Sequence, residues 1–509
     1  MTEKISNLYE NAVKYVTLTI FGAAVLFLMV ISILFSCRVN SDEYTYYERD
    51  HIIVNVICLI VWCIFVYALK KYGNIRISAK AKKIAWSVSL CIYAVLIAAF
   101  VFYLRMPPKA DQKQVLEIAM NMISGEYSEF AKGGYVDTYP NQVGLIYFCY
   151  ILFQILPFGY QAFRLLNVIS ITLSIFLINE IGNLVLEQKE EKKYIYGIVA
   201  MFFLPLAGYV TFLYGNNIGL AFSLSGIWAV CKLLKKKKWR YVVLAIVTLA
   251  CSVVVKQNYV IPVIGVLLIL LYYCFKKPNK ISITCLMGIM VGIILFSNVV
   301  NWRVEKITGI GISDGVPSLA WVVMGLQEGY MTDGWHNGYN KDVYQENGCD
   351  TEKTKKVVKA DLKERVQEMI HTPAASFRFF YRKTVSQWNN PSFECFWITD
   401  VNQRKKEGIA VGDYNKIVKG VVGEPGNPVL YEYMDIYQSI IWLGVVFWMF
   451  FKGKKATILQ MLFAIIFVGG FLFHTIWEAK CQYVMPYFIL ILPYAVMGYG
   501  AMVERIGKK

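Results

Sequence analysis

The chain has 509 residues, 57% of them hydrophobic and 15% aromatic, with a mean hydropathy of +0.46, which excludes an ordinary soluble domain and indicates an all-α polytopic membrane protein. In a soluble protein, the formal net charge of +17 would favour nucleic acid as the partner. Here the basic residues gather in short loops between apolar runs, so we interpret the charge as a topology signal and as contact with the anionic head groups of a lipid bilayer, with no nucleic-acid partner.

Apolar runs of spanning length recur along the chain, since a helix needs about 20 apolar residues to cross a bilayer. The first run, 13–37, is too long for the core of a cleaved signal peptide, so we expect it to act as a signal anchor. A further run, 141–156, is short. The pattern predicts about 12 to 13 transmembrane helices, with full runs at 13–37, 52–69, 84–104, 162–186, 195–213, 218–234, 241–255, 259–275, 281–300, 436–451, 457–473 and 484–502.

Lysine and arginine residues orient these runs, because both are enriched in short cytoplasmic loops. The loop at 70–83 carries six of them, so we expect it to be cytoplasmic. This orientation places the N-terminus inside and Asp111 outside, in a multi-pass protein of the cell membrane. The other loops and tails with the same predicted location are 232–240, 276–280, 452–455 and 505–509.

The short run at 141–156 decides the topology, because a full crossing there would move every later basic loop to the outside. We therefore interpret it as re-entrant or surface-lying; the alternative is that another run is misdrawn. This topology divides the chain into four units. They are an N-terminal pair of transmembrane helices (1–83), a transmembrane core with an outer loop at 105–161 (84–300), a large extracytoplasmic region (301–435) and C-terminal transmembrane helices (436–509).

Ionisable residues at the outer ends of the runs are the candidates for chemistry, since charged groups beside a membrane are costly. Asp111 follows the run at 84–104, where a partly desolvated carboxylate can accept a proton from an attacking hydroxyl or help to hold a divalent cation. The alternative is a helix-end charge. Lys256, at the tip of an apolar hairpin, is placed to bind a lipid phosphate; the alternative is a lysine that snorkels to the interface.

The last outer tip carries Glu478 and Lys480, followed by Tyr483. The two charged residues either pair with each other or orient a phosphate or an acceptor. Arg164, which opens the run at 162–186, is expected to make a structural contact with the loop that contains Asp111.

The outer region contains a stretch rich in aromatic and amide side chains, including Trp335, His336 and Asn337. Such mixtures bind sugars, because a ring face stacks on the sugar and amides meet its hydroxyl groups; a folded loop with its own small core is the alternative. The four histidines show no ligand spacing, so no metal site is predicted. A disulfide between Cys349 and Cys395 is open if this side is oxidising.

Four motifs together resemble the GT-C fold, the polytopic glycosyltransferases that use polyprenyl-phosphate sugars and include the protein O-mannosyltransferases and the aminoarabinose transferases of lipid A. They are Asp111 after a span, Tyr139-Pro140 where the outer loop re-enters the membrane, Lys256-Gln257-Asn258 at a hairpin tip, and the E-x-K-x-x-Y-x-x-P pattern that starts at Glu478. The resemblance covers about 84–502. Members often have an acidic pair where this chain has Asp111-Gln112, which leaves the need for a divalent cation open.

The resemblance implies an inverting transfer of a sugar from a polyprenyl-phosphate donor to a cell-wall or surface glycan, lipid or protein outside the cytoplasm. Asp111 would be the general base. Lys256 and Lys480 would bind the donor phosphate, and the substrate-binding residues would be Tyr139, Gln257, Trp335, His336, Asn337, Glu478 and Tyr483.

The alternative function is a transporter, or a polysaccharide polymerase or ligase of another fold. A transporter would place ionisable groups near the middle of the membrane. In this chain most charges lie at the ends of the apolar runs, with Glu180 as the main exception.

Overall fold

The structure is a computed structural model that describes residues 2–40, 43–73, 77–187, 193–395 and 427–507. Most of this part of the chain is helical, which confirms the predicted all-α class. The strands that it contains are β1 (Phe35–Val39) and β2 (Thr45–Arg49), which pair antiparallel in one hairpin. This hairpin corrects the predicted end of the first run, because α1 stops at Leu34.

Within the described residues, nine helices are long and apolar enough to cross a membrane. Two further apolar helices, α11 (Trp239–Val255) and α22 (Leu462–Ile476), are shorter. Helix α23 lies at the centre with most of its side chains buried, whereas α2, α3 and α13 expose most of their apolar residues. The nine are α1 (Thr2–Leu34), α2 (Ile52–Tyr72), α3 (Ala79–Leu104), α7 (Tyr160–Leu186), α10 (Gly215–Lys236), α12 (Val260–Lys276), α13 (Lys280–Thr308), α21 (Pro428–Phe451) and α23 (Cys481–Ile506).

Ion pairs show which helix ends lie together at one end of the bundle. Lys235 of α10 lies 3.7 Å from Glu187, just after α7, and Lys70 of α2 lies 3.8 Å from Glu504 of α23. Each pair joins the C-terminal ends of two helices. This agreement supports the direction that the basic loops predict for all four helices.

The short segment before α7 does not carry the chain across the bundle. Helix α6 (Val143–Ile155) starts after Gln142, which lines a cavity at the opposite end from the ion pairs. Helix α7 then begins at the same end, because Arg164 Nη2 donates a hydrogen bond of 2.7 Å to Met106 O, just beyond the end of α3. The geometry favours the re-entrant interpretation of 141–156, and it gives Arg164 the structural contact that we expected.

The run at 195–213 was predicted as one span, and the structure shows this prediction to be wrong. The segment is broken into α8 (Ile195–Met201), α9 (Leu204–Gly208) and the 3-10 turn η4 (Tyr209–Thr211). Pro205 cannot continue a helix from α8, because it lacks an amide hydrogen. The freed backbone carbonyls are satisfied from α7, since Asn167 Nδ2 donates to Val210 O at 3.1 Å and Phe212 O at 2.8 Å.

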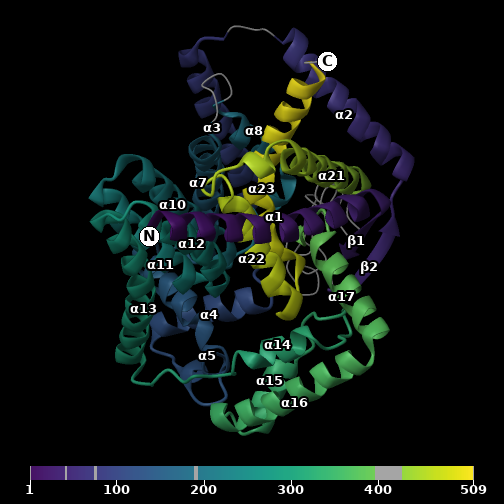
Figure 1. The fold of residues 1–509 in the computed structure, drawn as a ribbon. Coiled ribbons are helices and arrows are strands. Elements are labelled where there is room, and N and C mark those ends of the chain that lie inside the picture. The colour runs from purple at the N-terminus through teal and green to yellow at the C-terminus, as the bar shows by residue number, and fades with distance from the viewer. Residues whose placement is uncertain (1, 41–42, 74–76, 188–192, 396–426, 508–509) are drawn as a thin grey trace.

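The described part of the outer region forms a helical layer at one end of the molecule (Figure 1). The sequence pattern predicts helices near 317–327 and 356–371, and α14 and α16 confirm both. In Figure 1 this layer lies beside α4 and α5, while the end of α2 and the start of α3 lie at the opposite end. The layer consists of α14 (Leu319–Gly325), α15 (Tyr339–Glu346), α16 (Thr351–His371) and α17 (Pro373–Trp388). The two helices beside it are α4 (Asp111–Ser124) and α5 (Tyr135–Thr138).

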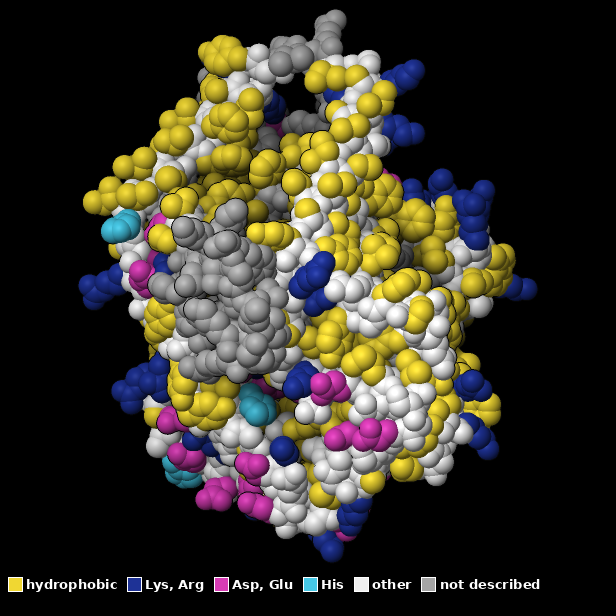
Figure 2. Space-filling model, turned by 180° about the vertical axis from the view of Figure 1, so that it is seen from behind, with side chains coloured by type: hydrophobic (Ala, Val, Ile, Leu, Met, Phe, Trp, Pro, Cys, Tyr) yellow, Lys and Arg dark blue, Asp and Glu magenta, His cyan; other side chains and the backbone are white. Residues whose placement is uncertain are grey.

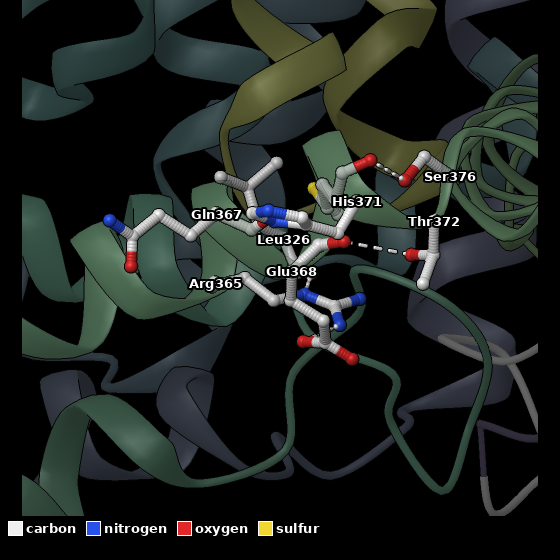
Figure 3. A network of polar contacts seen from close by, with 8 residues as sticks. Leu326, Arg365, Gln367, Glu368, His371, Thr372 and Ser376 are labelled. Atoms are coloured by element: carbon white, nitrogen blue, oxygen red, sulfur yellow. Dashed lines mark hydrogen bonds and ion pairs between the residues drawn. The ribbon is translucent and has the colours of Figure 1, made fainter.

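Polar contacts fix the corner between α16 and α17 (Figure 3). Arg365 Nε donates to Leu326 O at 2.6 Å, which ties α16 to the end of α14, and Arg365 Nη1 lies 2.6 Å from Glu368. Thr372 Oγ1 donates to Glu368 O at 2.8 Å, and Ser376 Oγ donates to Met369 O at 2.7 Å. The layer is therefore held by its own polar network, as a region outside a bilayer can be. Figure 2 agrees, since Asp and Glu side chains lie mostly on the lower half of that view and hydrophobic side chains cover much of the upper half.

Close packing of α21 on α23 gives a stability prediction. A Cβ atom on Gly498 would lie 1.8 Å from Gly444 O, so Gly498→Ala must push the two helices apart. Overpacking typically costs about 1–3 kcal/mol, and we expect a lower midpoint of thermal unfolding in detergent. Gly500→Ala is the matched control, because a Cβ on Gly500 of the same helix meets nothing within 4 Å. Equal midpoints for the two variants would contradict this packing.

Candidate functional site

A cavity of about 640 Å³ lies at the end of the bundle that carries α4, α5 and the outer helical layer. Its walls come from segments far apart in the sequence, and they mix aromatic rings, amides and charged groups. Most residues of the predicted site are among them. The lining includes Glu43, Asp111, Tyr135, Tyr139, Asn141, Gln142, Tyr214, Lys256, Gln257, Asn258, Asp314, Trp321, His336, Asn340, Trp477, Glu478, Lys480 and Tyr483.

Asp111 is the first residue of α4, and its side chain is exposed to the cavity. The backbone turns sharply just before it, with a φ of 48° at Ala110, so the helix starts at the cavity wall. A carboxylate at a helix N-terminus is favoured by the helix dipole. Burial and the negative charges of Asp111, Glu478 and Asp342 raise the pKa of Tyr139, so its hydroxyl stays neutral.

Lys256 is held between aromatic faces at the C-terminal end of α11. Its Nζ lies 4.2 Å from the ring centroid of Tyr214 and 5.7 Å from that of Tyr483. Burial lowers the pKa of Lys256 to about 8, against the raising effect of Asp111 and Glu478. Among the described residues, no hydrogen-bond acceptor or carboxylate pairs with this nitrogen. Cation–π contacts therefore orient a cation that is still able to bind an anion.

Lys480 pairs with a different residue from the one that the sequence offered. Its Nζ lies 2.7 Å from Glu43 Oε1, and both side chains are 13% exposed. Burial works against the charge of Lys480, but Glu43, Glu394 and Glu478 together raise its pKa. Glu478 is buried and accepts a hydrogen bond from Tyr483 Oη at 3.4 Å. Burial raises the pKa of Glu478, partly offset by Lys480 and His336.

Aromatic rings form one wall of the cavity. The rings of Trp321 and Trp477 are parallel to within 2° at a centroid distance of 6.0 Å, and Tyr139 lies 6.2 Å from Trp321. The amides of Gln257 and Asn258 lie elsewhere on the lining. Flat rings together with amides match the two faces of a sugar, its apolar C–H surface and its hydroxyl groups.

The outer helical layer is tied directly to the loop that contains Asp111. Val316 N donates to Thr138 O at 3.1 Å, and Ser313 Oγ donates to Asp137 O at 3.0 Å. The two chains approach closely at Gly315, whose φ is +60° and where an added Cβ would lie 2.3 Å from a Pro140 carbon. The outer region therefore forms part of the cavity wall.

Two residues of the predicted sugar-binding stretch lie behind the wall. Trp335 is fully buried, and its Nε1 donates to Ser386 Oγ at 3.0 Å. Asn337 Nδ2 donates to Gln327 Oε1 at 2.9 Å, and neither residue is part of the cavity lining. His336, between them, does line the cavity. The alternating direction of side chains along this turn explains why neighbours in sequence have different roles.

Within the described residues, no group of three or more His, Cys, Asp and Glu side chains is arranged to hold a metal ion. The open question of a divalent cation at Asp111 therefore gains no support from the protein's own ligands. The two cysteines of the outer region are not joined by a disulfide. Cys349 lies near Gly133 and Cys395 lies against Gly208, so the pairing left open by the sequence is wrong.

Sequence reasoning missed several lining residues, above all Glu43, Asp314, Trp321 and Trp477. Glu43 carried a usable signal, because it is an acidic residue in the polar segment between the first two apolar runs. The tryptophans carried none, since an aromatic residue at a membrane interface is ordinary.

The fold and the cavity define the class of protein: an all-α polytopic membrane protein with a polar and aromatic cavity at one end of its helical bundle. The chain belongs to a family of conserved hypothetical integral membrane proteins, whose family model matches residues 6–502. No curated protein and no solved structure matches it. Membership implies contact with a lipid bilayer, and the reaction must be argued from the cavity.

Proposed function

We propose that the protein is a membrane glycosyltransferase of the GT-C type, which takes a sugar from a polyprenyl-phosphate donor and transfers it to an extracytoplasmic acceptor. One observation carries the proposal. Asp111 and Lys256, from two separate junctions between helices, line the same cavity. A base and a cation in one aromatic, amide-lined cavity are the groups that transfer from a sugar phosphate requires.

The chemistry assigns one role to each side of the cavity. The acceptor hydroxyl oxygen bonds to the anomeric carbon, and the bond from that carbon to the phosphate oxygen breaks on the opposite face, which inverts the configuration. Asp111 takes the hydroxyl proton. The polyprenyl phosphate leaves with the electron pair, and the ammonium of Lys256 stabilises the charge that gathers on it. Stacking on Trp321 or Tyr139 would hold the sugar between the two.

The distribution of ionisable groups favours this function over a transporter. The carboxylates and ammonium groups described above gather in the cavity at one end of the bundle, whereas a transporter places its substrate site near the midplane. Ionisable residues inside candidate spans, such as Glu180 of α7 and the buried Asp435 of α21, are the exceptions among the described residues. Transfer of labelled sugar from a polyprenyl-phosphate donor by purified protein tests the proposal. Transport of a solute into sealed vesicles, without transfer of sugar, would contradict the proposal and favour a transporter.

The proposed side of the membrane gives a labelling prediction. Basic loops face the cytoplasm, so the cavity should open to the outside. In a background without reactive native cysteines, Lys132→Cys and Lys341→Cys should react with an impermeant maleimide on intact cells, because both positions are exposed at the cavity end. Lys236→Cys and Lys454→Cys, exposed at the other end, should react only after lysis. The reverse pattern would invert the topology.

A further inference from the structure

The Glu43–Lys480 ion pair joins the N-terminal hairpin to the end of the chain at the cavity wall. The two charged atoms are 2.7 Å apart, and both residues line the cavity. Glu43 lies in the turn between β1 and β2 and has a φ of 65°, a conformation that a glutamate adopts only where its surroundings hold it. An acidic side chain is therefore fixed in place against Lys480.

The hairpin is packed so that Glu43 has little freedom to leave. Val39 of β1 is buried against Ala479 and Cys481, the neighbours of Lys480. Cys37 N donates to Asn389 O at 2.8 Å, and Thr45 N of β2 donates to Met331 O at 3.4 Å. The hairpin is thus a wall of the cavity rather than a separate appendage.

The pair changes what the cavity can offer to an anionic ligand. Among the described residues, two ammonium groups line the cavity, those of Lys256 and Lys480, and Glu43 pairs with the second. Lys256 makes only cation–π contacts within the described residues. Asp111, Asp314 and Glu478 add negative charge to the walls. Among the described lining residues, no further ammonium or guanidinium group is left to pair with a second phosphate group.

We propose that Glu43 sets the number of phosphate groups that the cavity accepts, because it occupies Lys480 and leaves Lys256 to bind a single phosphodiester. This inference rests on the proposed function and deepens it by making Glu43 a specificity-determining residue against diphosphate-linked donors. The selectivity comes from an unfavourable environment for the second charge as much as from a contact with the first.

The test compares two ligands that differ by one phosphate and carry no sugar, the methyl diesters of farnesyl phosphate and farnesyl diphosphate. Wild-type protein in detergent should bind the monophosphate diester more tightly. In Glu43→Gln, Lys480 loses this ion-pair partner while Glu394 and Glu478 stay near it, and the ratio of the two Kd values should shift toward the diphosphate by about tenfold, the value of one charge-assisted contact. Glu48→Gln is the matched control, because Glu48 lies on the same hairpin but pairs with Arg38 at 2.7 Å, away from this cavity.

Each outcome separates the two proposals. Binding of neither ligand by wild type would overturn the proposed function and this inference together. Binding of the monophosphate diester with a ratio that Glu43→Gln leaves unchanged would overturn this inference alone. A ratio that shifts equally in Glu48→Gln would also overturn it, because the effect would then come from the hairpin as a whole.

A second measurement uses the wild-type protein, so it does not depend on the folding of a variant. An amine-reactive acylating reagent at about pH 9 attacks neutral amines, and peptide mass spectrometry reports the rate at each lysine. Lys256 should react faster than Lys480, and the monophosphate diester should protect Lys256. Equal reaction of the two lysines, or protection of Lys480 alone, would contradict the proposal.

Discussion

Asp111→Asn is expected to lower the rate of sugar transfer by about 10² to 10⁴, the contribution of a positioned general base. Asparagine has nearly the shape of aspartate but cannot take the proton of the acceptor hydroxyl. Because the side chain is exposed to the cavity and the amide oxygen of asparagine can keep the contact with Tyr135, folding and donor binding should stay largely intact. Transfer is measured with a labelled polyprenyl-phosphate sugar and normalised to folded protein.

Asp314→Asn is the control for this variant, since Asp314 lines the same cavity but is not assigned the proton. It loses the same charge, so a purely electrostatic effect on the cavity would lower transfer equally in both variants. If Asp111 holds a divalent cation as well, a chelator should reproduce the loss in wild type. If Asp111 is only a helix-end charge, the change would cost at most about 1 kcal/mol of stability from the helix dipole and turnover would persist.

Lys256→Ala is expected to weaken donor binding by about 10- to 100-fold, since it removes one charged contact to the phosphate. The variant loses the two cation–π contacts of Lys256, so the midpoint of thermal unfolding should fall only by the small amount that such contacts contribute. Lys256→Arg should restore the charge without restoring full affinity, because a planar guanidinium does not fit the space of a compact ammonium between two rings. Lys113→Ala is the control, because Lys113 is an exposed lysine of α4 that pairs with Glu117 at 4.0 Å. Unchanged donor affinity in Lys256→Ala would leave Lys256 as an interfacial lysine.

The same residue predicts a pH dependence. Burial lowers the pKa of Lys256 to about 8 in the free protein, so the ammonium loses its proton as the pH rises through this value. Donor binding by wild type should therefore weaken between about pH 8 and 10. In Lys256→Arg the dependence should disappear, because arginine keeps its charge throughout this range.

The sequence predicted much of the framework, because membrane spans follow from local composition. Most of the helices could be read from the hydrophobic runs. The break at 195–213 could not, because the run is uniformly apolar and the compensating hydrogen bonds come from Asn167 on another helix. Pro205 was the local signal, and a single proline does not always break a membrane helix.

Some residues of the candidate site could likewise be predicted from the sequence, and others could not. Asp111 and Lys256 could be found because each is an isolated charge at the end of an apolar run. The partner of Lys480 could not, because Glu43 is far from it in sequence and the nearer Glu478 looked equally suitable. Trp335 was predicted to bind substrate but is buried behind the cavity wall. The sequence shows that a tryptophan is present but not which way its side chain faces.

The central claim is that the cavity binds a polyprenyl-phosphate sugar, and photo-crosslinking tests it most directly. A donor that carries a photoreactive group near its phosphate is bound to purified protein, irradiated and located by peptide mass spectrometry. The account predicts cross-links within 110–142 and 255–260, lost when unlabelled donor is added in excess. Cross-links confined to the opposite end of the bundle, or cross-links that excess donor does not displace, would contradict it.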